Sequence, residues 1–212
     1  MRMSFVLPAL LVLTIFAAAT FSDDNLEEGF VSLWDGKTFD NWQISENPDS
    51  WSIKDGQIIA NGPRSHLYYV GELAPFKNFV LKVDCKTEPN SNSGIYFHTK
   101  VQGEGWPHWG YESQVNNSHA DPIRSGSLWS VVNVMQKHID DGEWWTQTIT
   151  VKDDHIRVEL NDIIVVDYHQ RPLQPFDPED YQRYLSEGTF CFQAHDPVSK
   201  VYFKNIRVQK LD

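Results

Sequence analysis

The chain has 212 residues and a formal net charge of −11, and 41% of its residues are hydrophobic and 13% aromatic. This composition excludes a disordered chain, and an acidic balance without a Lys/Arg cluster argues against a nucleic-acid partner or an anionic membrane partner. Eight tryptophans and only three methionines favour a β fold with aromatic binding surfaces over a helical bundle.

The N-terminal segment has the pattern of a secretory signal peptide. Arg2 supplies a small positive region, residues 5–16 are apolar, and Ala17 to Ala19 form a small-residue cleavage site. An uncleaved anchor is the alternative, but about 15 apolar residues are short for a membrane span. We therefore predict a secreted or periplasmic protein with a signal peptide over 1–19, an acidic lead-in over 20–28 and one domain over 29–212.

Short alternating runs separated by turn residues fill the rest of the chain. Residues 51–62 predict a hairpin around Asp55-Gly56, the best short-range hairpin signal in the sequence. Residues 79–87 and 128–134 each read as one strand, and residues 142–168 read as a three-strand meander. The Pro-rich residues 171–188 predict a loop with a short helix near 179–185, before the closing strands over 189–196 and 200–211.

The strand count and the cysteines point to the same kind of fold. Roughly a dozen short strands with regular turn signals predict an all-β sandwich of two antiparallel sheets. Alternation places Cys85 on a core face with Phe79, and Cys191 on an outer face with Gln193. Export permits a disulfide, but opposite faces favour two free thiols.

Two alternating segments, residues 92–99 and 110–116, form the candidate site. Each has a core face, and the opposite faces carry Tyr96 and His98 on the first segment and Glu112, Gln114 and Asn116 on the second. Together these faces offer a carboxylate, two amides, an imidazole and a phenol, a set that suits sugar hydroxyls and includes candidates for acid–base chemistry. A solvated outer sheet face is the alternative interpretation.

Two loops near these strands are also candidates. The tryptophans of loop 101–109 either plug the end of the sandwich or form a rim on which a sugar ring stacks. Loop 117–127 is polar. No tight ligand spacing is present, so no metal is predicted. Structural calcium bound by loop oxygens stays open. A metal site is also the alternative interpretation of five residues: His98, Glu112, His119, Asp121 and His195.

An ordered set of motifs, which includes LWDGKTFDNW, NSGIYFHTK, GYESQVNN, DPIRSGSLW and QAHDPVSKVYFKNIRV, resembles the 3-keto-disaccharide hydrolase domain family over residues 29–211. The resemblance implies a concanavalin A-like, laminarinase-type jelly roll with a concave sheet that binds sugar. It also implies an exported protein that cleaves glycosides already oxidised to a ketone at C3. His98 stands where an Arg is common in the family, and the E-x-D-x-x-E signature of laminarinases is missing.

The candidate site residues come from the strand faces, the neighbouring loops and the motifs that resemble the family. We predict Glu112 and His195 as the catalytic acid–base pair, in which either residue can be the acid and the other the base. The predicted substrate-binding residues are Asn92, Tyr96, His98, Trp109, Gln114, Arg124, Trp129 and Gln193. The substrate is expected to be a carbohydrate, and no cofactor is expected. A non-catalytic, lectin-like binding module is the main alternative to a hydrolase, and an adhesive surface domain is the third.

Overall fold

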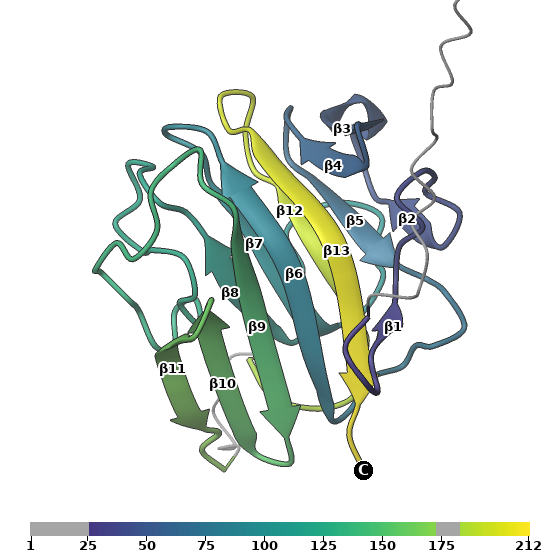
Figure 1. The fold of residues 1–212 in the computed structure, drawn as a ribbon, viewed down its shortest axis with the longest axis vertical. Helices are drawn as coiled ribbons and strands as arrows, with labels where there is room; N and C mark the ends of the chain where they lie inside the picture. The colour runs from purple at the N-terminus through teal and green to yellow at the C-terminus, as the bar shows by residue number, and fades with distance from the viewer. Residues whose placement is uncertain (1–25, 173–182) are drawn as a thin grey trace, which may run out of the picture.

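Alternating apolar residues assemble into two antiparallel sheets in the computed structural model, which describes residues 26–172 and 183–212. The predicted signal peptide, 1–19, lies outside these residues. The larger sheet has the order β11 (Ile163–His169), β10 (His155–Leu160), β9 (Trp145–Lys152), β6 (Phe79–Thr87), β13 (Val201–Lys210), β4 (Gln57–Ala60) and β3 (Trp51–Lys54), with β1 (Val31–Ser32) paired to β13 (Figure 1).

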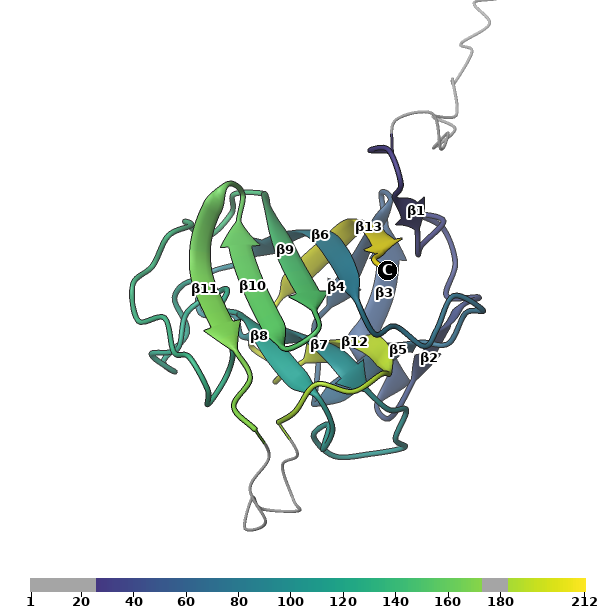
Figure 2. The same ribbon diagram turned by 90° about the horizontal axis from the view of Figure 1, so that it is seen from below.

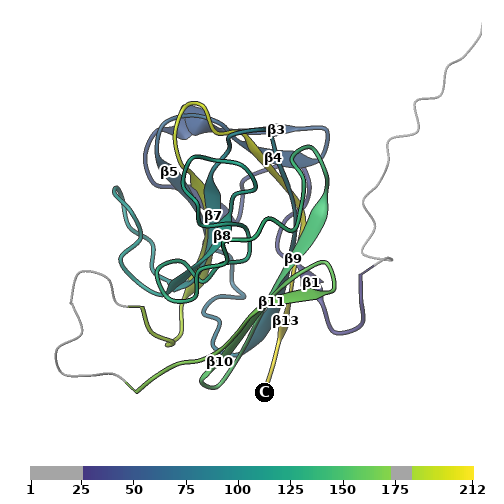
Figure 3. The same ribbon diagram turned by 90° about the vertical axis from the view of Figure 1, so that its left-hand side faces the viewer.

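The smaller sheet packs against the larger one and carries the candidate site. Its order is β2 (Trp42–Ile44), β5 (Ser65–Tyr69), β12 (Thr189–Ala194), β7 (Ser93–Thr99) and β8 (Tyr111–Val115). Figures 2 and 3 show the two sheets as separate layers. A short 3₁₀ helix, η2 (Pro48–Ser50), precedes β3. The predicted all-β jelly-roll sandwich is confirmed.

The core between the sheets is aromatic. The ring of Phe192 in the smaller sheet stacks on Trp42, at 5.2 Å between centroids, and on Phe203 of the larger sheet, at 4.6 Å. Along β6, buried and half-buried residues alternate from Phe79 to Thr87. Each fully buried aromatic side chain contributes about 1.5–3 kcal/mol by leaving water, so this interface fixes how the sheets sit on each other.

The predicted hairpins form where the turn residues placed them. Asp55 and Gly56 both have positive φ angles, 51° and 67°, between β3 and β4. The meander of β9, β10 and β11 turns at Asp153 and again at Asn161, with φ angles of 56° and 53°. Left-handed residues at such turns match the twist of the flanking strands.

Two predicted elements are corrected. Residues 128–134 form a turn rather than a strand: the backbone N–H groups of Val131 and Val132 both donate to the carbonyl of Leu128, and Ser130 has a φ of 62°. Of the helix predicted near 179–185, residues 179–182 lie outside the described ranges and 183–185 are not helical.

The cysteines are free, as predicted. Cys85 lies in the core between the sheets, whereas Cys191 lies on the other side of the smaller sheet with Tyr68 and Tyr96. Burial raises the pKa of both thiols, which keeps them protonated and poorly reactive. The described residues form no helix that is long and apolar enough to span a membrane.

Gly110, just before β8, provides a test of this fold. Its φ is +75°, and a Cβ there would lie 2.1 Å from the carbonyl oxygen of Phe97. Gly110→Ala should lower the free energy of unfolding by at least about 1–2 kcal/mol, because it adds a backbone clash to a left-handed conformation. Urea unfolding measures this, with Gly103→Ala as control, since nothing lies within 4 Å of a Cβ at Gly103. Equal stability of the two variants would contradict the described geometry.

Candidate active site

A row of four side chains crosses the outward face of the smaller sheet. Tyr68 on β5, Cys191 on β12, Tyr96 on β7 and Glu112 on β8 are direct cross-strand partners. All four are buried. Glu112 therefore stands at the end of a floor made of two phenols and a thiol, where a charged carboxylate is poorly solvated.

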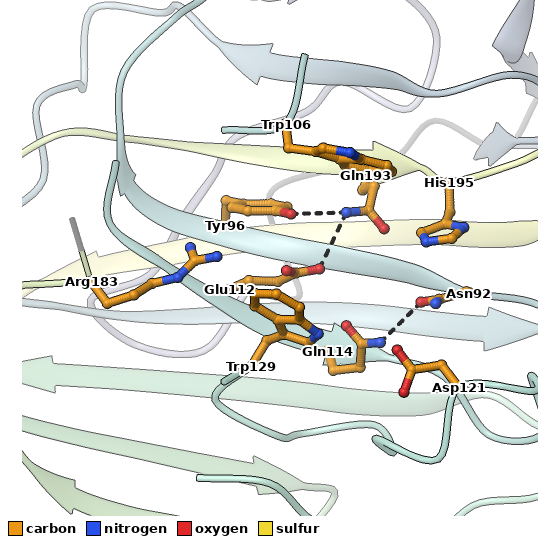
Figure 4. Close-up of a pocket in the computed structure, with 10 residues that line it drawn as sticks. All are labelled: Asn92, Tyr96, Trp106, Glu112, Gln114, Asp121, Trp129, Arg183, Gln193 and His195. Carbon is orange, nitrogen blue, oxygen red and sulfur yellow. Dashed lines mark hydrogen bonds between the residues drawn. The ribbon is translucent and has the colours of Figure 1, made fainter. Parts of the chain in front are cut away.

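Gly94 on β7 leaves room for the carboxyl group of Glu112. A Cβ at Gly94 would lie 2.2 Å from Oε1 of Glu112, so the carboxyl group lies across the β7 backbone. There the side-chain amide of Gln193 donates to Oε1 of Glu112 (3.2 Å) and to the hydroxyl of Tyr96 (2.9 Å) (Figure 4). Three strands thus converge on one carboxyl group.

These side chains line a cavity of about 240 Å³. Seven of the ten predicted site residues line it: Asn92, Tyr96, Glu112, Gln114, Trp129, Gln193 and His195. Asn92 and Gln114 are joined by a hydrogen bond of 3.0 Å between their side chains. These seven residues give the cavity three amides, two aromatic rings, one imidazole and one buried carboxyl group. Amide, phenol, indole and imidazole groups of this kind bind sugar hydroxyls.

Burial raises the pKa of Glu112 to about 7. The positive charge of Arg183 and hydrogen bonds from Tyr96 and Gln193 oppose this shift, but burial outweighs them, and the charge of Asp121 adds to it. Near neutral pH the carboxyl group is therefore partly protonated and can give or take a proton, as acid–base catalysis requires.

Three further residues complete the cavity wall: Trp106, Asp121 and Arg183. Trp106 was anticipated as a rim residue, and Asp121 only as a metal ligand. Arg183 was missed; its guanidinium lies 5.3 Å from the centroid of the Trp129 ring and donates to the carbonyl of Gly110 (3.3 Å). No periodic pattern in the Pro-rich segment could have predicted its place, because its contacts with Gly110 and Trp129 form only in the folded protein.

His195 forms a hydrogen-bonded pair with the residue that follows it. Its Nδ1 lies 2.7 Å from Oδ2 of Asp196. Burial disfavours the charge on Asp196, but hydrogen bonds from His195, from Ser199 and from the backbone N–H groups of Val198 and Ser199 outweigh burial and lower the pKa of the carboxyl group. An ionised Asp196 accepts a hydrogen bond from the Nδ1–H group of His195, and in that tautomer Nε2 of His195 is an acceptor.

His119 extends this pair, and the three residues bring possible metal-ligand atoms within 4.8 Å of one another: His119, His195 and Asp196. The backbone N–H of Asp121, however, donates to Nδ1 of His119 (3.1 Å). A neutral His119 then carries its proton on Nε2, which points to Asp196 at 3.7 Å. In this tautomer neither nitrogen of His119 is free to bind a metal, because a metal-binding nitrogen must be unprotonated and the lone pair of Nδ1 already accepts the hydrogen bond from Asp121.

His98 is placed away from the cavity, in contrast to its prediction as a substrate contact. Its φ of 55° breaks the alternation at the end of β7. The ring turns to the carbonyl of Lys77 (2.9 Å) and to the N–H of Ser186 (3.1 Å). Burial lowers the pKa of His98 to about 4, so it is a neutral structural histidine.

Arg124 and Trp109 also lie outside the cavity wall, contrary to their predicted sugar contacts. Arg124 donates from Nη1 to the carbonyls of His119 (2.9 Å) and Asp121 (2.8 Å), so it shapes the loop that carries Asp121. Trp109 is covered by Lys100, whose ammonium lies 4.2 Å from the ring centroid. Both side chains are used in local contacts that the sequence pattern did not reveal.

Comparison with known proteins places the chain in a family. A family model described as a 3-keto-alpha-glucoside-1,2-lyase-like domain matches residues 29–209. The chain belongs to this family. A curated relative from Bacteroides thetaiotaomicron, named 3-keto-disaccharide hydrolase, is 26% identical over 234 residues, covering 87% of this chain and 79% of the relative. Together they support a carbohydrate-active, hydrolase-like protein.

Solved structures agree on the fold. A candidate glycosyl hydrolase from Parabacteroides distasonis matches with a TM-score of 0.71 and 23% identity, over 87% of this chain and 95% of that one. The carbohydrate binding module CBM66 from Bacillus subtilis matches with a TM-score of 0.59 and 14% identity, over 80% and 96% of the two chains. At these identities the matches show the shared sandwich and nothing about the reaction.

The buried carboxyl group predicts a pH-dependent stability. A pKa raised from 4.5 to about 7 means that the folded protein holds a proton that the unfolded chain releases above pH 4.5, so the stability contributed by this group falls as pH rises towards 7. Glu112→Gln removes the effect. As pH rises from 5 to 8, the free energy of unfolding of the wild type should fall by about 2–3 kcal/mol relative to that of the variant. Urea unfolding at each pH measures this difference.

Glu46→Gln is the control for this experiment. Its pKa is lowered, chiefly by the hydrogen bond from Arg64, so its contribution changes below pH 4.5 and stays constant between pH 5 and 8. If the Glu112→Gln difference is as flat as the Glu46→Gln difference over this range, Glu112 is an ordinary solvated carboxylate.

Proposed function

We propose that the protein is an exported enzyme that cleaves glycosides carrying a ketone at C3 of the sugar. The description of its family and the name of its curated relative support this substrate class. The observation on which the proposal rests is that a buried carboxyl group with a pKa of about 7 shares one cavity with His195. The signal-like residues 1–19 support export to the periplasm or the medium.

The proposed chemistry is an elimination followed by hydration. A ketone at C3 acidifies the hydrogen at C2, so a base can remove it and leave an enolate across C2 and C3. The enolate then expels the glycosidic oxygen from C1, which takes a proton from an acid, and a C1–C2 double bond forms. Addition of water across that bond gives the free 3-keto sugar. Only protons move between protein and substrate, so no redox cofactor takes part.

His195 is the proposed base and Glu112 the proposed acid. The Nδ1–H group of His195 donates to Asp196, so Nε2 is the nitrogen that accepts the C2 proton. Glu112 is partly protonated near pH 7 and can donate to the leaving oxygen. Tyr96 and Arg183, beside this carboxyl group, supply a hydroxyl and a positive charge for developing negative charge.

Substitutions that keep shape and remove titration test the proposal. Glu112→Gln and His195→Gln should each lower turnover of a 3-keto glycoside by about 10²-fold or more, while binding stays within about tenfold. If both residues act in one reaction, the double variant should be little worse than either single one. Rapid-quench kinetics and calorimetric binding give the two quantities; EDTA should change neither.

The pH profile assigns the roles in the same experiment. An acid must be protonated, so kcat/KM of the wild type should fall as pH rises through about 7. A rise through that pH would make Glu112 the base. A wild type that binds native glycans, turns over no keto sugar, and loses only affinity in both variants would identify a lectin-like module.

A further inference from the structure

Two buried histidines in this protein differ in one respect. His98 has partners for both ring nitrogens, the carbonyl of Lys77 and the N–H of Ser186. His66 on β5 is fully buried, yet neither Nδ1 nor Nε2 has a hydrogen-bond partner within the described residues. Buried polar groups without partners are uncommon and destabilise a fold. The unpartnered imidazole of His66 therefore lowers stability, which is expected of a residue that has a functional role.

His66 lies directly behind the cavity wall. It is the cross-strand partner of Gln193. Its ring meets the rings of Tyr96 and Trp106 edge-on, each at 5.7 Å between centroids. Gln193, Tyr96 and Trp106 all line the cavity (Figure 4), and Oε1 of Gln193 is likewise without a partner among the described residues. Two unused polar groups therefore stand side by side at this end of the site.

The imidazole of His66 is neutral near pH 7. Burial lowers its pKa to about 3, while the charge of Glu46 opposes the shift. A neutral imidazole offers one N–H donor and one nitrogen acceptor. A sugar hydroxyl also donates and accepts, so it matches the two unused capacities of the ring without placing a charge in the site.

Trp106 covers His66 and is held by contacts that can be broken. The guanidinium of Arg64 lies 5.3 Å from the Trp106 ring centroid. Oε1 of Glu46 accepts from Nε of Arg64 (2.9 Å) and from the backbone N–H of Gly105 (3.0 Å). The Arg64 and Glu46 side chains are 39% and 20% exposed, so solvent partly screens this half-buried pair and weakens its hold on Trp106.

We propose that His66 forms the floor of a second sugar subsite, next to the cavity that holds the reacting ring. The second ring of a disaccharide displaces Trp106 from the imidazole of His66. The C–H face of that sugar ring then stacks on the indole, and one of its hydroxyl groups forms a hydrogen bond with a ring nitrogen of His66. The inference rests on the proposed function only in taking the ligand to be a glycoside. The second subsite makes the protein bind a disaccharide more tightly than a monosaccharide.

The test is the binding of unoxidised sugars, which needs no turnover. Cellobiose and maltose are the two-ring probes, and glucose is the one-ring probe, all titrated by calorimetry. His66→Leu removes both nitrogens at similar volume and should weaken binding of the disaccharide that the wild type prefers by at least about tenfold, with glucose binding unchanged. Its melting temperature should equal or exceed that of the wild type, because an unpartnered polar group is lost.

His98→Leu is the matched control. It breaks two hydrogen bonds away from the cavity, so it should lower the melting temperature by at least about 2 °C and leave both affinities unchanged. If His66→Leu does not fold, His66→Gln, which keeps a donor and an acceptor, should retain more disaccharide affinity than His66→Ala.

Several results would overturn the subsite: disaccharide affinity unchanged in His66→Leu, equal loss for glucose and disaccharide, a loss of stability like that of His98→Leu, or no wild-type binding of either disaccharide. Turnover of 3-keto glycosides by the wild type is measured separately. A wild type that binds disaccharides through His66 but turns over no keto sugar would refute the proposed reaction and leave the subsite standing.

Discussion

The carboxyl group of Glu112 is held out of water on the face of a sheet, and the remaining geometry of the cavity follows from that placement. Gly94 leaves the space beside it, and Gln193 ties it to Tyr96. β8, which carries Glu112, is an edge strand of the smaller sheet. The backbone N–H of Trp129 donates to the carbonyl of Glu112 (2.9 Å), so the following segment covers that edge and excludes solvent and other strands.

Burial and charge act in opposite directions on this group, and burial prevails. The protein is acidic overall, with a net charge of −11, yet an arginine, Arg183, lies near the buried carboxyl group and lowers its pKa only in part. A solvated glutamate would be fully ionised at neutral pH, and a glutamate closely paired with Arg183 would be more so. The intermediate state is the one that suits proton transfer near neutrality.

Local alternation explains which site residues could be predicted from the sequence. Tyr96, Glu112, Gln114 and Gln193 lie in regular strands, where every second side chain shares a face, and all four line the cavity. Three predicted residues lie outside the cavity lining. At His98 a left-handed φ ends the alternation, and the directions of the loop residues Arg124 and Trp109 depend on contacts made after folding.

Other features needed the assembled fold. Arg183 reaches the cavity from a segment without periodicity, and the lack of partners for His66 depends on the rings packed around it. The hydrogen bond between His195 and Asp196 joins sequence neighbours. An acidic residue directly after a candidate catalytic histidine is a local signal from which this contact could have been predicted.

The most direct test of the account follows the hydrogen at C2 of the sugar. A 3-keto glycoside is incubated with the wild-type protein in D₂O, and the early product is analysed by NMR and mass spectrometry against a protein-free control. Elimination and hydration predict a 3-keto sugar that carries deuterium at C2, together with a transient C1–C2 alkene. Cleavage that keeps hydrogen at C2 would contradict the proposed removal of that proton by a group in this cavity.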